Sequence, residues 1–232
     1  MKFNSRLIAR LAGSLAFRVA CYFAMMWMAL WAEARAAPRL PDAVLDVVPY
    51  VPWVDRYNYL LWLVAYVPVA LWLLAKDSER FLRYMYSAGY IALIRGLCIM
   101  VTGLGPVHGD DLHAGMSFET RLNAFLSMIT PFGFFDTGAG ARVYLTKDLF
   151  FSGHTATTVL LLLYVWRYPM LRAVMLIAHV LVVFSVFFSH LHYTIDVIGA
   201  YAITLTLFTL REGRLGVNPE PTSAAASAAP GP

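Results

Sequence analysis

Charged residues are scarce in this chain. Asp, Glu, Lys and Arg make up 14% of the 232 residues, against about 25% in soluble domains. Apolar residues make up 60%, and the mean hydropathy is +0.63. This composition excludes an ordinary soluble domain and indicates an integral membrane protein. The length fits one compact bundle of helices.

Cysteine is also scarce, and no basic cluster stands out. Cys21 and Cys98 both lie in apolar runs without a partner motif, which excludes a disulfide scaffold and a cysteine-based zinc site. We interpret them as small buried hydrophobic residues. The net charge of +4 is spread over many short segments, so we predict no nucleic-acid partner. The stretch HGDDLH at 108–113 has irregular spacing, which argues against a metal site.

Long apolar segments dominate what remains. A bilayer core of about 30 Å is crossed by roughly 20 helical residues, and backbone groups in lipid need internal partners. Six segments fit: 13–32, 58–75, 84–104, 149–166, 171–189 and 193–210. The sequence therefore predicts an all-α bundle of six transmembrane helices. We assign 1–12 to a cytoplasmic N-terminus, 13–211 to the membrane domain and 212–232 to a low-complexity, disordered tail.

Basic residues set the predicted orientation. Ten of them share one side if the helices alternate: Lys2, Arg6, Arg10, Lys76, Arg80, Arg83, Arg167, Arg172, Arg211 and Arg214. The positive-inside rule makes that side cytoplasmic, with 33–57 and 105–148 on the opposite side. The basic start, apolar run and AEARAA at 32–37 are also typical of a cleaved signal peptide. We favour a retained helix, and both alternatives orient the later segments alike.

The stretch HLHYTID at 190–196 separates two apolar segments on the non-cytoplasmic side. His192 and Asp196 are four residues apart, which places them on one face of a helix start. A carboxylate there can accept the Nδ1 proton of the imidazole and leave Nε2 free for attack or proton transfer. The alternative is a pair that only caps the helix. Ionisable groups inside membrane segments favour a functional interpretation.

A second polar stretch, KDLFFSGHT at 147–155, opens the fourth segment on the same side. Ser152 and Gly153 alone are typical of a helix N-cap, with His154 an interfacial residue. Taken together, however, the stretches 147–155 and 190–196 place two histidines and one aspartate at the same depth in the membrane. One histidine can then attack while the other moves protons. A nearby helix N-terminus favours an anionic phosphate.

Several other residues are candidates with open alternatives. Arg95 lies in mid-segment and is expected to face the bundle, either contacting phosphate or paired with another residue. Glu119 is the one glutamate in 105–148 and either has a role at the site or is a solvated loop acid. His179 is expected to bond a backbone carbonyl. Aromatic residues able to cradle a quaternary ammonium, or to form an interfacial belt, are Phe134, Phe135, Tyr144, Phe150 and Phe151.

The motifs resemble a known superfamily. SGH followed by HxxxD is similar to the type 2 phosphatidic acid phosphatase superfamily of histidine-nucleophile lipid phosphatases. The wider pattern resembles its sphingomyelin synthase branch. Four stretches match that family's motifs in the family's order: LPD at 40–42, RGLCIMVTGLGP at 95–106, DLFFSGHT at 148–155 and HYTIDVIGAY at 192–201. Gly105 interrupts the second motif, and Lys147 stands where the family has a cysteine before the third.

The resemblance implies a two-step transfer. His192 would attack the phosphorus of a phospholipid, and His154 would protonate the departing diacylglycerol oxygen. His154 would then take the proton of a ceramide hydroxyl, which attacks the phosphohistidine. Asp196 would hold His192, and Asp148, about two turns before His154, would tune it or bind a cationic head group. No cofactor is implied.

The resemblance implies a head-group phosphotransferase acting on phosphocholine or phosphoethanolamine. Its partners would be a phospholipid donor, a ceramide-like acceptor and membrane lipids, and the sequence leaves a homo-oligomer open. A lipid hydrolase of phospholipase C or phosphatidic acid phosphatase type and a non-enzymatic membrane protein are the alternatives. We expect a bacterial inner membrane with a periplasmic site, or else a Golgi or plasma membrane with a site facing the lumen or outside.

Overall fold

The computed structural model describes residues 5–130 and 145–213, and every regular element in these two ranges is a helix. The helices are α1 (Ser5–Glu33), α2 (Pro52–Lys76), α3 (Ser78–Val101), α4 (Phe118–Ile129), α7 (Gly153–Val165), α8 (Pro169–Phe188) and α9 (Thr194–Glu212). The all-α prediction is confirmed for these residues. The predicted tail beyond Gly213 lies outside them.

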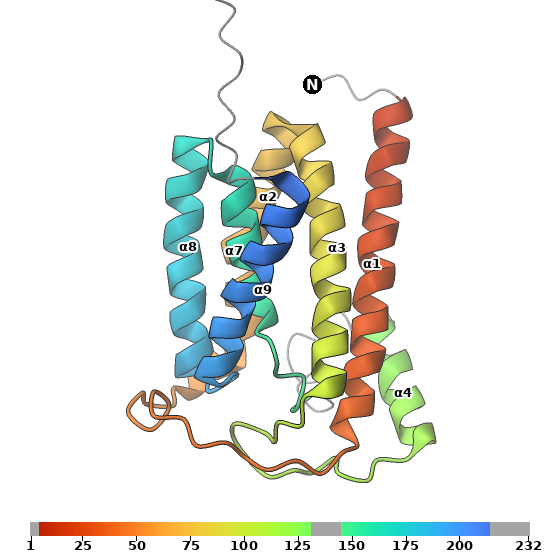
Figure 1. Ribbon diagram of the computed structural model, residues 1–232, viewed down its shortest axis with the longest axis vertical. Coiled ribbons are helices and arrows are strands. Elements are labelled where there is room, and N and C mark those ends of the chain that lie inside the picture. The colour runs from red at the N-terminus through yellow and green to blue at the C-terminus, as the bar shows by residue number, and fades with distance from the viewer. Residues whose placement is uncertain (1–4, 131–144, 214–232) are drawn as a thin grey trace, which may run out of the picture.

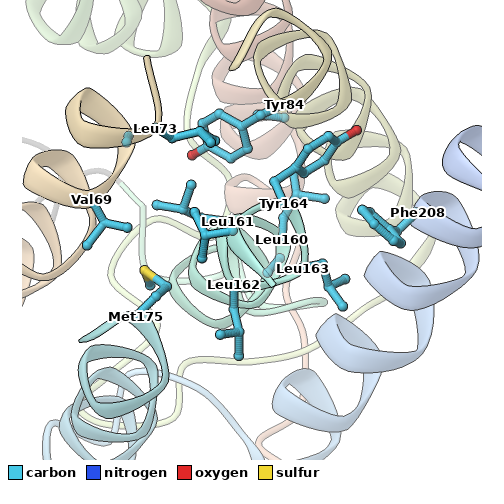
Figure 2. Close-up of a cluster of buried hydrophobic side chains, with 14 of the residues drawn as sticks. Val69, Leu73, Tyr84, Leu160, Leu161, Leu162, Leu163, Tyr164, Met175 and Phe208 are labelled. Carbon is cyan, nitrogen blue, oxygen red and sulfur yellow. The ribbon is translucent and has the colours of Figure 1, made fainter. Parts of the chain in front are cut away.

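Helix α7 forms the centre of an up-and-down bundle, with α2, α3, α8 and α9 packed around it (Figure 1). From Val159 onward its sequence is apolar on all sides, as expected of a helix enclosed by others, and ten of its 13 residues are buried. Figure 2 shows how the run Leu160–Tyr164 meets Leu73 of α2, Tyr84 of α3, Met175 of α8 and Phe208 of α9. Helix α1 lies at the edge and packs along α3.

Five of the described helices are long and apolar enough to cross a bilayer, namely α1, α2, α3, α8 and α9. Helix α7 has 13 residues and is about 20 Å long. The prediction of a helix over 149–166 is wrong at its start, because Phe151 and Ser152 make non-helical contacts described below. Six full-length spans are therefore not confirmed. Helices α1 and α2 begin earlier than predicted, and Pro52 suits the first turn of α2.

The basic ends of the helices meet at one end of the bundle. Arg10 of α1 pairs with Glu79 of α3 at 2.5 Å, and Arg83 pairs with Glu212 of α9 at 3.2 Å. Arg167, between α7 and α8, pairs with Asp77, between α2 and α3. The predicted grouping of basic helix ends on one side agrees with the structure for these residues. Lys2 and Arg214 of that prediction lie outside the described residues.

The opposite end carries the connections α1–α2, α3–α7 and α8–α9 and a helix that the sequence analysis missed. Helix α4 begins after Ser117, whose hydroxyl accepts the amide proton of Thr120 at 3.1 Å. Phe118 and Phe125 of α4 meet Trp27 of α1 edge-on. The periodic pattern was present in the sequence, but at 12 residues the helix is too short to cross a bilayer.

Candidate active site

The turn between α8 and α9 places His192. Helix α8 ends in a left-handed residue, His190 (φ 46°). The amide of His190 donates to the carbonyl of Phe187, and that of Leu191 donates to Val186 at 3.1 Å. This is the Schellman arrangement that terminates many helices. It reverses the chain and leaves His192, 2% exposed, directly before α9.

Asp196 lies in the first turn of α9 and is fully buried. Its Oδ2 accepts the amide proton of Tyr193 at 2.9 Å and lies 3.4 Å from Nδ1 of His192. The Asp196 carboxylate therefore both caps α9 and faces the His192 ring, so each predicted role has its contact. The His–Asp separation is longer than a hydrogen bond, and such catalytic contacts often tighten only when substrate binds.

His154 lies in the first turn of α7, facing the same region. Ser152 caps this helix by accepting the amide proton of Thr155, and the Ser152 amide donates to the carbonyl of Asp196 at 3.0 Å. The start of α7 is therefore fixed to the first turn of α9. The ring centroids of His154 and His192 are 6.4 Å apart, so one phosphorus centre can lie between the two imidazoles.

Arg95 of α3 holds the segment that leads into α7. Its Nε donates to the carbonyl of Phe151 at 2.6 Å, and its Nη2 donates to the carbonyl of Asp148 and pairs with that carboxylate at 3.1 Å. A Cβ on Gly153 would lie 3.3 Å from the guanidinium, so glycine leaves room for it. Arg95 faces the bundle as predicted. Asp148, however, is not helical, so its predicted two-turn relation to His154 is wrong.

Comparison with known proteins matches the segment that carries this site. Residues 147–212, which include both histidines, match the family model described as "PAP2 superfamily C-terminal". The chain is 31% identical over 188 residues to "Sphingomyelin synthase-related protein 1" of Mus musculus, covering 76% of this chain and 38% of that protein. It is 30% identical over 188 residues to "Phosphatidylcholine:ceramide cholinephosphotransferase 1" of Homo sapiens, covering 74% and 43%. Over most of its length, the chain is similar to sphingomyelin synthase-related and ceramide cholinephosphotransferase proteins.

The family resemblance predicted from the motifs is confirmed by these matches. The chain spans less than half the length of these curated relatives, and the family model covers only its last two motifs. The first two motifs contribute through long-range contacts in the fold, and these contacts are visible only in the structure.

The protein also anchors the segment before its third motif with a buried acid that sequence reasoning missed. Glu33, at the end of α1, is fully buried and accepts the amide protons of Thr146 at 2.9 Å and Lys147 at 2.8 Å. Lys147 donates through Nζ to the carbonyls of Glu33 and Arg35 and pairs with Asp111 at 2.5 Å. Lys147 thus fixes this segment to the end of α1. Glu33 lies in AEARAA, a stretch typical of a signal-peptide cleavage site, so its structural role was not predicted.

Trp62 of α2 is a second residue that the sequence analysis missed. Its ring centroid is 5.1 Å from that of His154, and Tyr66 and Tyr59 lie 4.6 Å and 5.4 Å from Trp62 on the same helix. The i, i+3, i+7 spacing was visible in the sequence, but it is also typical of ordinary membrane helices. Nothing local marked Trp62 as a neighbour of His154.

Two of the five aromatic residues predicted to cradle a head group or form an interfacial belt pack inside the bundle instead. Phe151 is fully buried in the core, and Phe150 packs so closely on α9 that a Cβ on Gly199 would lie 2.7 Å from its ring. The other three, Phe134, Phe135 and Tyr144, lie outside the described residues.

Glu119 and His179 make other contacts. Glu119 is exposed in the first turn of α4, which packs on α1. His179 bonds the hydroxyls of Thr158 (2.8 Å) and Tyr201 (2.7 Å). The predicted backbone carbonyl partner is wrong, because carbonyls in neighbouring helices already accept helical hydrogen bonds. Within 5–130 and 145–213, no group of three His, Cys, Asp or Glu side chains is placed to hold a metal ion.

Removing the Arg95 guanidinium is expected to destabilise the fold. Arg95→Met leaves the Asp148 carboxylate and two carbonyls without their donor, and breaking a buried pair from one side costs about 3–5 kcal/mol. We expect a clear fall in the midpoint of thermal unfolding in detergent. Arg56→Met is the matched control, because Arg56 is exposed at the same end of the bundle and such changes cost within about 0.5 kcal/mol. Equal midpoints for the two variants would contradict the role of Arg95.

Proposed function

We propose that this protein transfers a phospholipid head group, as phosphocholine or phosphoethanolamine, from a glycerophospholipid to ceramide or a related lipid alcohol. One observation carries the proposal: His154, His192 and Asp196 meet at one end of the bundle, with the carboxylate against one ring and the second ring 6.4 Å away. The relatives, which include phosphatidylcholine:ceramide cholinephosphotransferases, support the same chemistry with a phospholipid donor and a ceramide acceptor.

In the first step, Nε2 of His192 attacks the phosphorus of the donor. A P–N bond forms, and the P–O bond to diacylglycerol breaks. His154, protonated at the start, gives its proton to the departing oxygen. Asp196 holds the Nδ1 side of His192 and stabilises the positive charge that the ring gains. The products are diacylglycerol and a phosphohistidine that carries the head group.

In the second step, the primary hydroxyl of the acceptor occupies the position that diacylglycerol has left. His154, now neutral, takes the hydroxyl proton as the oxygen attacks the phosphorus. The P–N bond breaks, and its electron pair returns to His192. The cycle ends with His154 protonated and both histidines restored, so no external acid, base or metal is consumed.

The burial of this site suits transfer to a lipid alcohol. His192 and Asp196 are 2% and 0% exposed, and exclusion of water protects a phosphohistidine from hydrolysis. We also infer that the site faces away from the cytoplasm. The ion-paired basic helix ends lie at the opposite end of the bundle, where the positive-inside rule puts the cytoplasm. With this orientation, the site would face the periplasm in a bacterial inner membrane, or the lumen or outside in a Golgi or plasma membrane.

A lipid assay tests the proposal. Purified protein in liposomes is given labelled ceramide with either phosphatidylcholine or phosphatidylethanolamine, and products are read by mass spectrometry. We expect a labelled phosphosphingolipid, and the donor that supports it identifies the head group. Diacylglycerol with free phosphocholine or phosphoethanolamine would instead indicate a hydrolase. Release of inorganic phosphate from phosphatidic acid would indicate a phosphatase, and no turnover of any donor would contradict an enzymatic role.

A further inference from the structure

The connection between α1 and α2 crosses beneath the bundle and reaches the α8–α9 turn (Figure 1, brown-orange trace). We call residues 38–51 of this connection the strap. Near its end, the amide of Val51 donates to the carbonyl of Phe188 at 2.8 Å, and Nε2 of His190 bonds the carbonyl of Val48 at 2.9 Å. The strap therefore follows the same turn that carries His192.

Asp42 binds the first residue of α9 from the strap. Its Oδ2 accepts the amide proton of Thr194 at 2.5 Å, and its Oδ1 accepts the Thr194 hydroxyl proton at 2.8 Å. The first amides of a helix have no partner within the helix and need an acceptor from elsewhere. A carboxylate at this position also complements the positive end of the helix dipole. The acceptor for α9 comes from 152 residues earlier in the chain.

Tyr193 carries the second contact between the strap and the turn. Its hydroxyl accepts the amide proton of Leu40 at 3.1 Å and donates to the carbonyl of Gly105 at 3.0 Å. The amide of Gly105 donates in turn to Pro38 at 2.9 Å. A Cβ on Gly105 would lie 2.5 Å from the carbonyl oxygen of Ala37, so only glycine fits this approach. The first two sequence motifs thus converge on the residue that follows His192.

Asp42 and Asp196 bind two adjacent residues at the start of α9. Asp42 fixes the amide and hydroxyl of Thr194, and Asp196 accepts the amide proton of Tyr193 while it faces His192. If Thr194 shifts, Tyr193 and the first turn of α9 shift with it, and the Asp196–His192 contact changes. No atom of the LPD stretch needs to touch the lipid for this effect.

We propose that Asp42 is a positioning residue, whose contacts with Thr194 hold the His192–Asp196 pair in the geometry for attack on phosphorus. The proposal rests on the proposed function for its catalytic meaning, but the strap contact can be tested without turnover.

The ionisation of Asp42 fits this task. Burial raises the pKa of its carboxyl, but hydrogen bonds from Thr194, Leu45 and Val44 outweigh burial and hold the pKa below its usual value of 3.8. The carboxylate is therefore charged throughout the neutral range. Its contribution to stability is present above the ordinary pKa and is lost only as the pH falls through the lowered one.

The kinetic test compares Asp42→Asn and Asp42→Ala with Asp46→Asn. Asp46 lies four residues along the strap and is exposed, so its variant makes the same charge change without the Thr194 contact. We expect kcat to fall about 10- to 100-fold in the Asp42 variants, as for a misplaced reacting group, with KM unchanged. Asp46→Asn should match wild type. A rise in KM that accounts for the whole loss would overturn positioning, because it would indicate substrate contact.

Thr194 variants keep the test independent of the folding of the Asp42 variants. Thr194→Ser retains the hydroxyl and is expected to keep wild-type kcat, whereas Thr194→Val loses one of the two bonds and should lower kcat. Adding Asp42→Asn to Thr194→Val should cost less than the sum of the two single changes. Full additivity would contradict a shared contact.

Hydrogen–deuterium exchange tests the contact between Asp42 and Thr194 without any need for turnover. We expect amides 193–197 to exchange faster in Asp42→Ala than in wild type or Asp46→Asn. If wild type transfers no head group but the exchange still differs, the strap contact stands while the proposed function fails. Unchanged exchange in 193–197 together with unchanged kcat would overturn the proposal.

Discussion

Replacement of His192 by alanine is expected to abolish head-group transfer. The variant lacks the nitrogen that forms the P–N bond, and loss of a nucleophile in a covalent mechanism costs on the order of 10⁶-fold in kcat. His192 occupies a capped turn rather than a helix interior, so alanine removes the ring without removing a bond that holds the turn. We expect thermal unfolding in detergent to change far less than activity. The lipid assay in liposomes measures the loss directly.

Trapping of the intermediate gives this prediction a second readout. Donor lipid with a labelled head group and no acceptor should label wild-type protein, and the label should be labile in acid and stable in alkali, as a P–N bond requires. His192→Ala should take up none. His108→Ala is the control, because it also removes a histidine and His108 is exposed, outside the α8–α9 turn. Retained turnover or labelling in His192→Ala would remove the nucleophile assignment.

The residues of the candidate site could be named from the sequence because local spacing places them. His192 and Asp196 are one helical turn apart, and His154 opens an apolar segment that must run alongside. Because consecutive helices run in opposite directions, both motifs lie at the same end of the bundle, however the helices pack. The same regularity explains why α2, α3, α8 and α9 were predicted as spans, with errors confined to their ends.

The contacts that support the site could not be predicted, since they join residues far apart in the chain. Asp42 meets Thr194 across 152 positions, and Glu33 meets Lys147 across 114. A single sequence holds no signal for such pairs. Trp62 illustrates the same limit, because its spacing on α2 is that of any membrane helix. The start of α7 was predicted too early for a related reason. The carbonyl of Phe151 accepts a hydrogen bond from Arg95, which lies 56 residues earlier in the chain.

Asp196→Asn distinguishes the two roles left open for this carboxylate. Asparagine retains an oxygen that can accept the amide proton of Tyr193, and Asn caps helices about as well as Asp. If Asp196 only caps α9, the variant should therefore be nearly as active as wild type.

A catalytic role predicts the opposite result for Asp196→Asn. The amide carries no charge to stabilise a positive His192, and its NH₂ group, if turned to Nδ1, favours the wrong tautomer. In a His–Asp pair of this type the change costs about 10⁴-fold in kcat with the geometry intact. We expect a loss of similar size in the lipid assay, with thermal stability near wild type. Asp196→Ala, which removes the cap as well, should lose both. Activity of Asp196→Asn within a few-fold of wild type would reduce Asp196 to a structural residue and leave His192 with no partner identified for its charge.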